Sequence, residues 1–337
     1  MSLLKLKFAA LLLAPPLLLS LPPITALSGC GQADAKDKLS VVCTVFPQYD
    51  WARQIIGSKT DVFDITLLLD KKIDLHSYQP SVEDIAKISR CDLFVYVGGE
   101  SDDWVRDALK EAVNKKLIAI NLIEKLGEAA KAEEIVDGME DDAGADEDAD
   151  GDKDEGEAEY DEHIWLSLRN AKALCAVITE AVASLDAGNA KVYNSNLAAY
   201  AAKLDALDRE YQAAVDAAPV KTLVFGDRFP FRYLVDDYGI KYSAAFAGCS
   251  AETEASFDTI IFLVNKINEL GLKNIIVTES SDKKIAETII RESKNKNQNI
   301  LTLDSMQSSA ASDVEEGKTY LSIMENNLEA LKEALGG

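Results

Sequence analysis

The chain of 337 residues contains two histidines, and both lie where a side chain could reach a ligand. His76 lies in Asp74-Leu-His-Ser-Tyr-Gln-Pro80, a polar connection just ahead of Ser81, which is placed to cap a helix. His163 lies in Tyr160-Asp-Glu-His-Ile-Trp-Leu-Ser167, where a highly acidic segment ends. Neutral imidazole is a ligand for several divalent transition metals. Each position would also suit a histidine that is simply hydrogen-bonded and binds no metal. The pair of histidines alone is therefore weak support for a metal site.

Known catalytic arrangements are missing from the sequence. Two imidazoles and a carboxylate with one open position could activate water, which would make the chain a metalloenzyme. However, the sequence contains no HExxH helix, no GxSxG elbow and no lysine-containing phosphate loop. It also offers no evident base paired with a nucleophile. We therefore predict a binding protein and not an enzyme.

The charge of the chain is acidic and unevenly distributed. The sequence has 58 Asp and Glu against 35 Lys and Arg, a net charge of -23. Residues 133–162 hold 17 of the acids and one lysine, so the rest of the chain is only mildly acidic. Neither part has the basic field that binds phosphate backbones, which argues against a nucleic-acid partner.

The acidic segment 133–160 has almost nothing to bury and is expected to be a mobile surface loop. Within it, Asp146 to Glu157 fits the spacing of an EF-hand calcium loop. Lys153 takes a position that is usually apolar, no amphipathic helices flank the pattern, and a segment this acidic matches it easily by chance. A solubilising loop that attracts cations weakly is the favoured interpretation.

The first 29 residues are typical of an export signal. Lys5 and Lys7 precede an apolar run that four prolines interrupt, a poor spanning helix. The run ends in Leu27-Ser-Gly-Cys30, which resembles a bacterial lipobox, so we expect Cys30 to carry a lipid anchor on the outer face of a membrane. Residues 30–38 would be a tether. An ordinary cleaved signal peptide, with Cys30 incidental, is the alternative.

Four further cysteines follow at wide spacings that match no disulfide framework or metal knuckle: Cys43, Cys91, Cys175 and Cys249. We interpret them mostly as small buried apolar residues, and one disulfide bridge stays open as an alternative.

Strands and helices alternate along the rest of the chain, which predicts parallel α/β sheets. Strands are expected at 41–45, 61–69, 92–97, 117–122, 222–225, 274–277 and 300–303, and helices at 49–56, 81–89, 104–114, 170–185, 189–217, 256–270, 282–291 and 320–335. The helix at 189–217 would be about 44 Å long, enough to run the height of a domain pair. We therefore predict an α/β lobe at 39–187, a linking helix at 188–218 and a second α/β lobe at 219–337.

Several motifs in a fixed order resemble one known family. They are Thr44-Val-Phe-Pro47, His76-x-Tyr-x-Pro-Ser81, Asp161-x-His-Ile-Trp-Leu-Ser167, Thr278-Glu-Ser280 and Thr302-Leu-Asp-Ser-Met306. The chain is similar in these to the zinc- and manganese-binding receptors of bacterial ABC importers, the TroA-like cluster A-I proteins. The resemblance implies two Rossmann-like lobes joined by a rigid helix, a metal cleft between them, an ABC permease as partner and a monomeric receptor.

The resemblance also implies four metal ligands. Three fall on His76, His163 and Asp304, but the expected third ligand, about five residues before Tyr233, falls on Arg228, and a guanidinium cannot bind a cation. Asp227 beside it is the favoured substitute. Water or a carboxylate from the following set is the alternative: Glu252, Glu254 and Glu279. Glu279 serves equally well as a hydrogen-bonded acid behind the ligands.

Two imidazoles with carboxylates and no thiolate suit zinc or manganese, and zinc is placed first. Two other functions stay open because of Arg228. With Arg232, it would suit an anionic or chelated cargo in the same receptor fold. A surface adhesin lipoprotein with a vestigial site, acting in cell adhesion, is the other.

Overall fold

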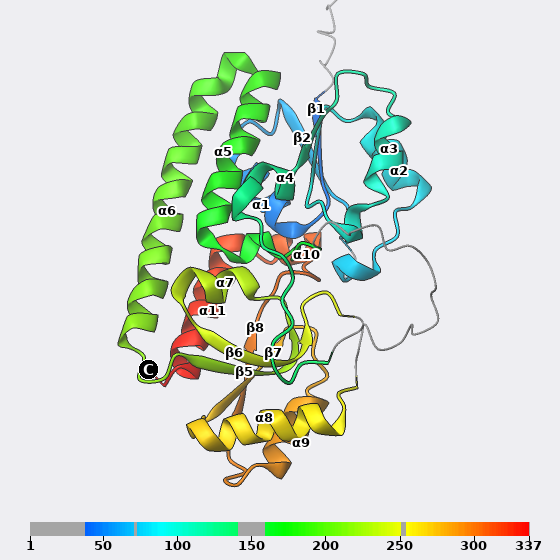
Figure 1. Ribbon diagram of the computed structural model, residues 1–337. Helices are drawn as coiled ribbons and strands as arrows, with labels where there is room; N and C mark the ends of the chain where they lie inside the picture. Colours follow the sequence, from blue (N-terminus) through cyan, green and yellow to red (C-terminus); the bar gives the residue numbers. More distant parts are fainter. Residues whose placement is uncertain (1–37, 71–72, 141–158, 251–253, 337) are drawn as a thin grey trace, which may run out of the picture. The chain divides into compact units, whose positions relative to one another are not determined.

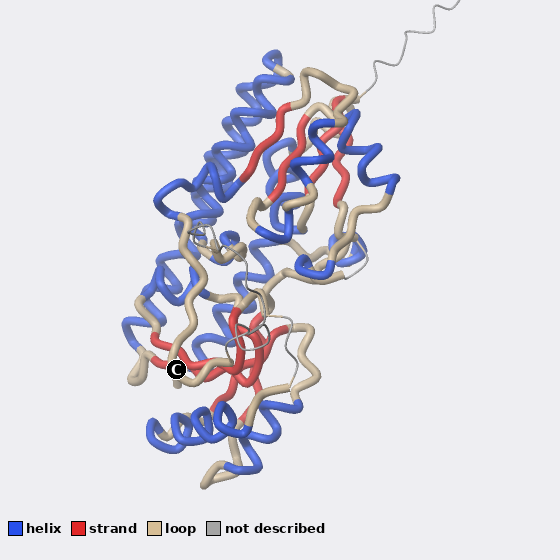
Figure 2. Tube along the Cα trace, turned by 45° about the vertical axis from the view of Figure 1, so that its right-hand side comes forward, coloured by secondary structure: helices blue, strands red, loops and turns tan. Residues whose placement is uncertain are grey.

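The structure is a computed structural model that describes residues 38–70, 73–140, 159–250 and 254–336. Strands and helices alternate and build two separate four-stranded parallel sheets (Figures 1 and 2), which confirms the expected α/β class. The predicted signal segment, Cys30, the EF-hand pattern and Glu252 lie outside the described residues. Within the described residues, no helix is both long and apolar enough to cross a membrane.

The first sheet has the strand order β2-β1-β3-β4. Its strands are β1 (Leu39–Cys43), β2 (Phe63–Leu67), β3 (Leu93–Tyr96) and β4 (Ile118–Asn121), and its helices are α1 (Phe46–Ile56), α2 (Val82–Arg90), α3 (Val105–Lys110) and α4 (Leu122–Leu126). The expected cap of α2 is present, because Ser81 Oγ accepts from the backbone of Asp84 and the Asp84 side chain accepts from the backbone of Ser81.

The second sheet repeats this order as β6-β5-β7-β8. Its strands are β5 (Thr222–Phe229), β6 (Lys241–Ala247), β7 (Asn274–Thr278) and β8 (Asn299–Leu303), and its helices are α7 (Arg232–Tyr238), α8 (Phe257–Leu270), α9 (Lys284–Glu292), α10 (Ala311–Glu315) and α11 (Tyr320–Ala334). In sheets of this order, ligands bind beyond the carboxyl ends of the strands where the order reverses.

Two helices lie between the sheets in sequence: α5 (Leu168–Leu185) and α6 (Ala190–Ala217). The 28 residues of α6 correspond to about 42 Å of helix. Its buried residues are Tyr193, Tyr200, Leu204, Leu207, Tyr211 and Val215, and they recur at helical spacing. This face packs against α1 from the first lobe and α11 from the second (Figure 1), so α6 connects the two lobes as predicted.

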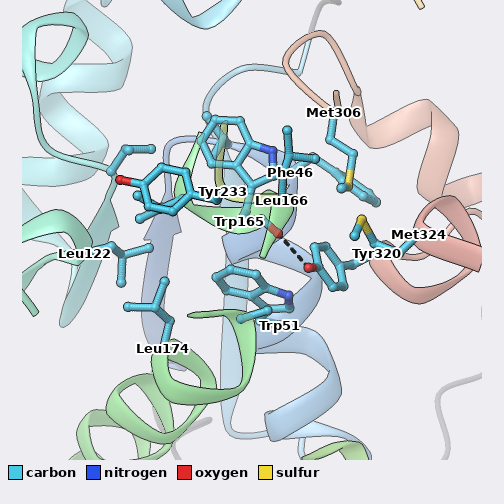
Figure 3. Packing of buried hydrophobic residues seen from close by; sticks show 14 of the residues in the cluster. Phe46, Trp51, Leu122, Trp165, Leu166, Leu174, Tyr233, Met306, Tyr320 and Met324 are labelled. Carbon is cyan, nitrogen blue, oxygen red and sulfur yellow. Dashed lines mark hydrogen bonds between the residues drawn. The ribbon is translucent and has the colours of Figure 1, made fainter. Parts of the chain in front are cut away.

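The lobes also share one hydrophobic core. Figure 3 shows Trp51 of α1 and Tyr320 of α11 packed around Trp165, and the Tyr320 hydroxyl donates to the Trp165 carbonyl at 2.6 Å. The buried carboxylate of Asp50 accepts from the backbone N–H of Tyr320 at 3.0 Å. Trp165 lies two residues after His163, so this core fixes the segment that carries the histidine.

The second lobe differs from the prediction around β5. This strand continues to Phe229, and its pairing with β6 shifts in register between Phe225 and Arg228, a β-bulge. Strand β6 and helix α7 were not predicted as elements. The β6 sequence Lys-Tyr-Ser-Ala-Ala-Phe-Ala contains small residues with weak strand preference.

Candidate metal centre

The structure brings the two histidines together at the carboxyl ends of the strands. His76 lies in a short 3₁₀ turn (Leu75–Ser77) that follows β2, and His163 lies just before the 3₁₀ turn that leads into α5. Their Nε2 atoms are 3.3 Å apart. In a tetrahedral zinc site with Zn–N bonds of about 2.0–2.1 Å, two ligating nitrogens are about 3.3–3.4 Å apart. The pair therefore has the spacing that a single zinc ion requires.

The other ring nitrogen of each imidazole is held by a polar partner. His163 Nδ1 is 2.9 Å from Asp161 Oδ1, and the same oxygen accepts from the His163 backbone at 2.8 Å. His76 Nδ1 is 2.9 Å from Ser101 Oγ and 3.5 Å from Glu162 Oε2. With Nδ1–H donating to Ser101 Oγ in His76 and to Asp161 Oδ1 in His163, the lone pair of each Nε2 is left to bind a metal.

The two imidazoles differ in proton affinity. Burial, followed by the nearby His163, lowers the pKa of His76 to about 3. Burial is the largest single influence on the pKa of His163 and acts to lower it, but Asp161 and the nearby glutamates together outweigh it, so the net shift is upward. Two nitrogens 3.3 Å apart can share one proton but cannot each carry one. A divalent cation would displace that shared proton.

Gln307, which the sequence analysis did not select, lies against both histidines. Its Nε2 atom is 3.0 Å from His76 Nε2 and 2.5 Å from His163 Nε2, and the residue is 4% exposed. It comes from the turn that follows β8, in which Met306 has a φ of 62°. The Gln307 Oε1 atom accepts from Ser305 Oγ at 3.0 Å. Position 307 directly follows the motif that ends at Met306. This adjacency is the sequence feature that could have pointed to Gln307.

Cys249 also approaches the histidines. It follows β6, and its sulfur lies with one nitrogen of each imidazole in a group whose atoms are all within 4.8 Å of one another. Its backbone N–H donates to Glu133 Oε1 at 3.0 Å, and burial raises the pKa of its thiol. No disulfide joins the four described cysteines. As expected, Cys43, Cys91 and Cys175 are fully buried. Cys249 is partly exposed.

Comparison with known proteins places the chain in a family. Residues 41–334 match the family described as zinc-uptake complex component A, periplasmic. This chain belongs to that family. The high-affinity zinc uptake system protein ZnuA of Bacillus subtilis is 33% identical over 306 residues, 90% of each chain. The zinc-binding lipoprotein AdcA of Streptococcus pneumoniae is 30% identical over 94% of this chain, which spans 60% of AdcA.

Solved structures show the same fold. The Zn(II)-bound ZnuA-like domain of S. pneumoniae AdcA matches with a TM-score of 0.67 and 26% identity, over 89% of this chain and all of that domain. The B. subtilis lipoprotein YcdH matches with a TM-score of 0.68 and 27% identity, over 88% of this chain and 99% of the other. The expected two-lobed metal-receptor fold is therefore confirmed. Members of this family are the extracytoplasmic, substrate-binding components of zinc uptake systems.

The β-bulge in β5 turns the favoured third ligand away from the histidines. Asp227 Oδ2 accepts from the backbone and hydroxyl of Thr278, at 3.0 and 2.9 Å, and its Oδ1 accepts from the backbone of Arg228. Arg228 instead reaches the first lobe, where its Nη2 atom is 2.9 Å from Asp74 Oδ2. Among the described residues, the group of ligand atoms around the histidines does not include Asp227.

The remaining carboxylates also lie outside that group. Asp304 Oδ1 accepts from the backbone of Met306, and Glu279 accepts from the backbone and hydroxyl of Ser305. Both acids thus hold the turn that presents Gln307, while Glu254 is exposed on the surface. Burial, followed by the charge of Asp304, raises the pKa of Glu279, so these two acids lie close together.

The basic residues of the cleft are neutralised within the protein. Arg228 pairs with Asp74, and Arg232 Nη1 lies 2.8 Å from Glu134 Oε2. An anionic cargo would have to compete with these carboxylates, so the geometry does not favour it.

A cavity of about 630 Å³ borders His76, and half of its lining residues are acids. His76 and Cys249 lie in its wall together with Glu100, Asp103, Glu133, Glu159 and Glu162. Repulsion from Glu159, followed by burial, raises the pKa of Glu100, as expected for crowded carboxylates. We call this set of acids the acidic vestibule. Its field attracts cations and repels anions.

Proposed function

We propose that this chain captures one Zn²⁺ ion between its lobes through His76 and His163 and delivers it to an ABC permease. The observation that carries the proposal is the convergence of the two Nε2 atoms to 3.3 Å, with each opposite nitrogen held by a polar partner. Family membership and the zinc named for the relatives support the choice of metal.

The chemistry of the centre favours binding without turnover. Both imidazoles are held by polar partners, and the Gln307 amide contacts both of them, an arrangement that suits holding an ion. Zinc is the cargo, and a further ligand from the second lobe, added to the two histidines of the first, would let the ion stabilise the closed form that a permease recognises. In this proposal Asp304 and Glu279 position the Gln307 turn, and Asp227 anchors the end of β7.

The proposal extends to the predicted domains and anchor. Residues 1–29 are removed, Cys30 is lipidated, residues 30–38 form the tether, and the two lobes at 39–187 and 219–337 act as one monomeric receptor around the helix at 188–218. The relative described as a zinc-binding lipoprotein supports the lipid anchor. Mass spectrometry of the membrane fraction tests it, because the mature chain should begin at Cys30 with a lipid attached.

The proposal is tested by native mass spectrometry of the metal-stripped protein offered Zn²⁺ and Mn²⁺. We expect one tightly bound Zn²⁺ in the wild type and none in the His76→Ala, His163→Ala variant. Asp227→Asn is the matched control, since it alters a cleft carboxylate that lies outside the histidine group, and it should keep the ion. Retention of the ion by the double variant would contradict the proposal.

A further inference from the structure

Cys249 is positioned by close packing of the β6 end against His163. Gly248 precedes it, and a Cβ atom there would lie 3.1 Å from His163 Cε1 and 2.9 Å from the Phe229 carbonyl oxygen. Only glycine therefore lets the chain pass this close to the imidazole. The next residue, Cys249, is held by the bond from its backbone to Glu133.

The sulfur completes a set of donors that come from three separate segments of the chain. The ligand atoms of His76, His163 and Cys249 lie within 4.8 Å of one another, the only such group among the described residues. Tetrahedral zinc with two nitrogens and one sulfur needs N–S separations of about 3.6 Å, given a Zn–S bond of about 2.3 Å. A small inward movement of the β6 end suffices to reach that distance.

We propose that Cys249 is the third ligand of the transported metal, bound as a thiolate, and that it makes the receptor selective for zinc over manganese. The second lobe would then supply its ligand from the end of β6, because the corresponding position on β5 is occupied by Arg228. On binding, the thiol proton passes to solvent and a metal–sulfur bond forms. This inference rests on the proposed zinc-capture function.

A thiolate changes which metal the site prefers. Soft sulfur ligands favour zinc, whereas manganese prefers carboxylate, carbonyl and water oxygens. Gln307, which touches both imidazoles, lies where an amide oxygen or a water would take the fourth position. A site with two imidazoles and a thiolate should therefore reject Mn²⁺ more strongly than the two-histidine, two-carboxylate set expected from the sequence.

The test is the absorption spectrum of the full chain loaded with Co²⁺, since cobalt bound to thiolate gives an intense near-ultraviolet charge-transfer band. We expect this band in the wild type and in the control Cys175→Ala, whose thiol is buried in α5. Cys249→Ser should lose the band while keeping weak visible bands from bound cobalt. Its zinc affinity should fall by roughly 100-fold, since losing even an outer-shell partner lowers affinity by 10–100-fold.

Each outcome separates the two proposals. A wild-type cobalt complex without the band, or a band that persists in Cys249→Ser, would overturn the role of Cys249 and leave zinc capture intact. Failure of the wild type to bind Co²⁺ or Zn²⁺ would overturn zinc capture itself. Zinc X-ray absorption of the wild type needs no variant, and it should show one sulfur at about 2.3 Å.

Discussion

At the scale of single residues, Gln307 is the contact that most directly controls the centre, because its amide touches both imidazoles. Gln307→Glu would replace a neutral amide by a carboxylate of the same shape. We expect about tenfold tighter zinc binding, about 1.4 kcal/mol, since the anion adds attraction to the metal. Manganese binding should improve as well, because carboxylate suits the harder ion. Isothermal titration against a competing chelator measures both.

The same substitution should affect the metal-free protein in the opposite direction. A carboxylate at this 4% exposed position is poorly solvated without a cation. Thermal unfolding should therefore show a lower midpoint without metal and a larger rise on adding zinc. Gln307→Leu serves as control, since it keeps a similar volume without a ligand atom. Equal zinc affinity in the wild type and Gln307→Glu would show that position 307 does not face the ion.

A buried acid outside the histidine group gives a pH prediction. Asp102 is 4% exposed, and burial raises its pKa from 3.8 to about 7 although Gly98 N–H donates to it. The folded state thus holds this proton more tightly than the unfolded state. Between pH 4 and 7 the free energy of unfolding should fall as pH rises, and this group should account for about 4 kcal/mol of the fall.

Asp102→Asn isolates that contribution, because its amide oxygen can still accept from Gly98. Urea unfolding at a series of pH values should give a flatter profile for the variant, with the variant more stable than the wild type at pH 8. Parallel profiles for the two proteins would show that Asp102 does not titrate in this range.

At the scale of elements, the sequence predicted those whose ends carry a local signal. Ser81 and Asp84 fixed the start of α2, and the Ala-rich run before Pro219 fixed the end of α6. Strand β6 was not predicted because its small residues have little strand preference. It becomes a strand at the edge of the sheet because it pairs with β5 in the folded protein. The bulge in β5 also leaves no signature in the sequence, yet it sends Asp227 and Arg228 in different directions.

Beside the bulge, Arg228 of β5 forms an ion pair with Asp74 of the first lobe and so bridges the two lobes. Asp74 Oδ1 accepts from the backbone of His76, while its Oδ2 accepts from Arg228 Nη2. Arg228→Met should therefore loosen the turn that carries His76. We expect the free energy of unfolding to fall by about 1 kcal/mol, since both side chains are one-fifth exposed. Zinc affinity should fall about fivefold, corresponding to about 1 kcal/mol.

A double-mutant cycle checks this interpretation. Asp74→Asn keeps the acceptor for the His76 backbone but removes the ion pair, so it should reproduce the loss seen in Arg228→Met. Combining the two substitutions should add little further loss, because each removes the same interaction. Additive losses would mean that Arg228 and Asp74 act independently.

At the scale of the whole molecule, the resemblance predicted the fold and pointed to the two histidines, but it did not point to Cys249 or Gln307, which the structure places beside them. His76 and His163 lie in contiguous motifs, whereas Cys249 and Gln307 reach them only through the relative placement of β6 and β8. Such distances across lobes depend on sheet register and bulges, which no local pattern encodes. The departure at Arg228 marked the position where the implied ligand set has a side chain that cannot bind a cation, without showing what stands in its place.

The acidic vestibule leads to a prediction about the rate of metal capture. Its carboxylates surround the approach to His76 and Cys249 in a chain whose net charge is -23. A cavity lined by one sign of charge raises the local concentration of counter-ions and makes association depend on salt. We expect the association rate of Zn²⁺ to fall several-fold in the Glu100→Gln, Glu159→Gln variant, about three- to tenfold at low ionic strength.

Stopped-flow measurements at several ionic strengths separate this effect from a change in the ligands. The dissociation rate should stay constant, since neither glutamate belongs to the histidine group, and the slope of association rate against salt should become shallower. Glu83→Gln, Glu329→Gln is the matched control: it removes the same charge from side chains that are 77% and 71% exposed and lie outside the vestibule. If the control slowed association equally, net charge would drive capture, and the vestibule would have no directing role of its own.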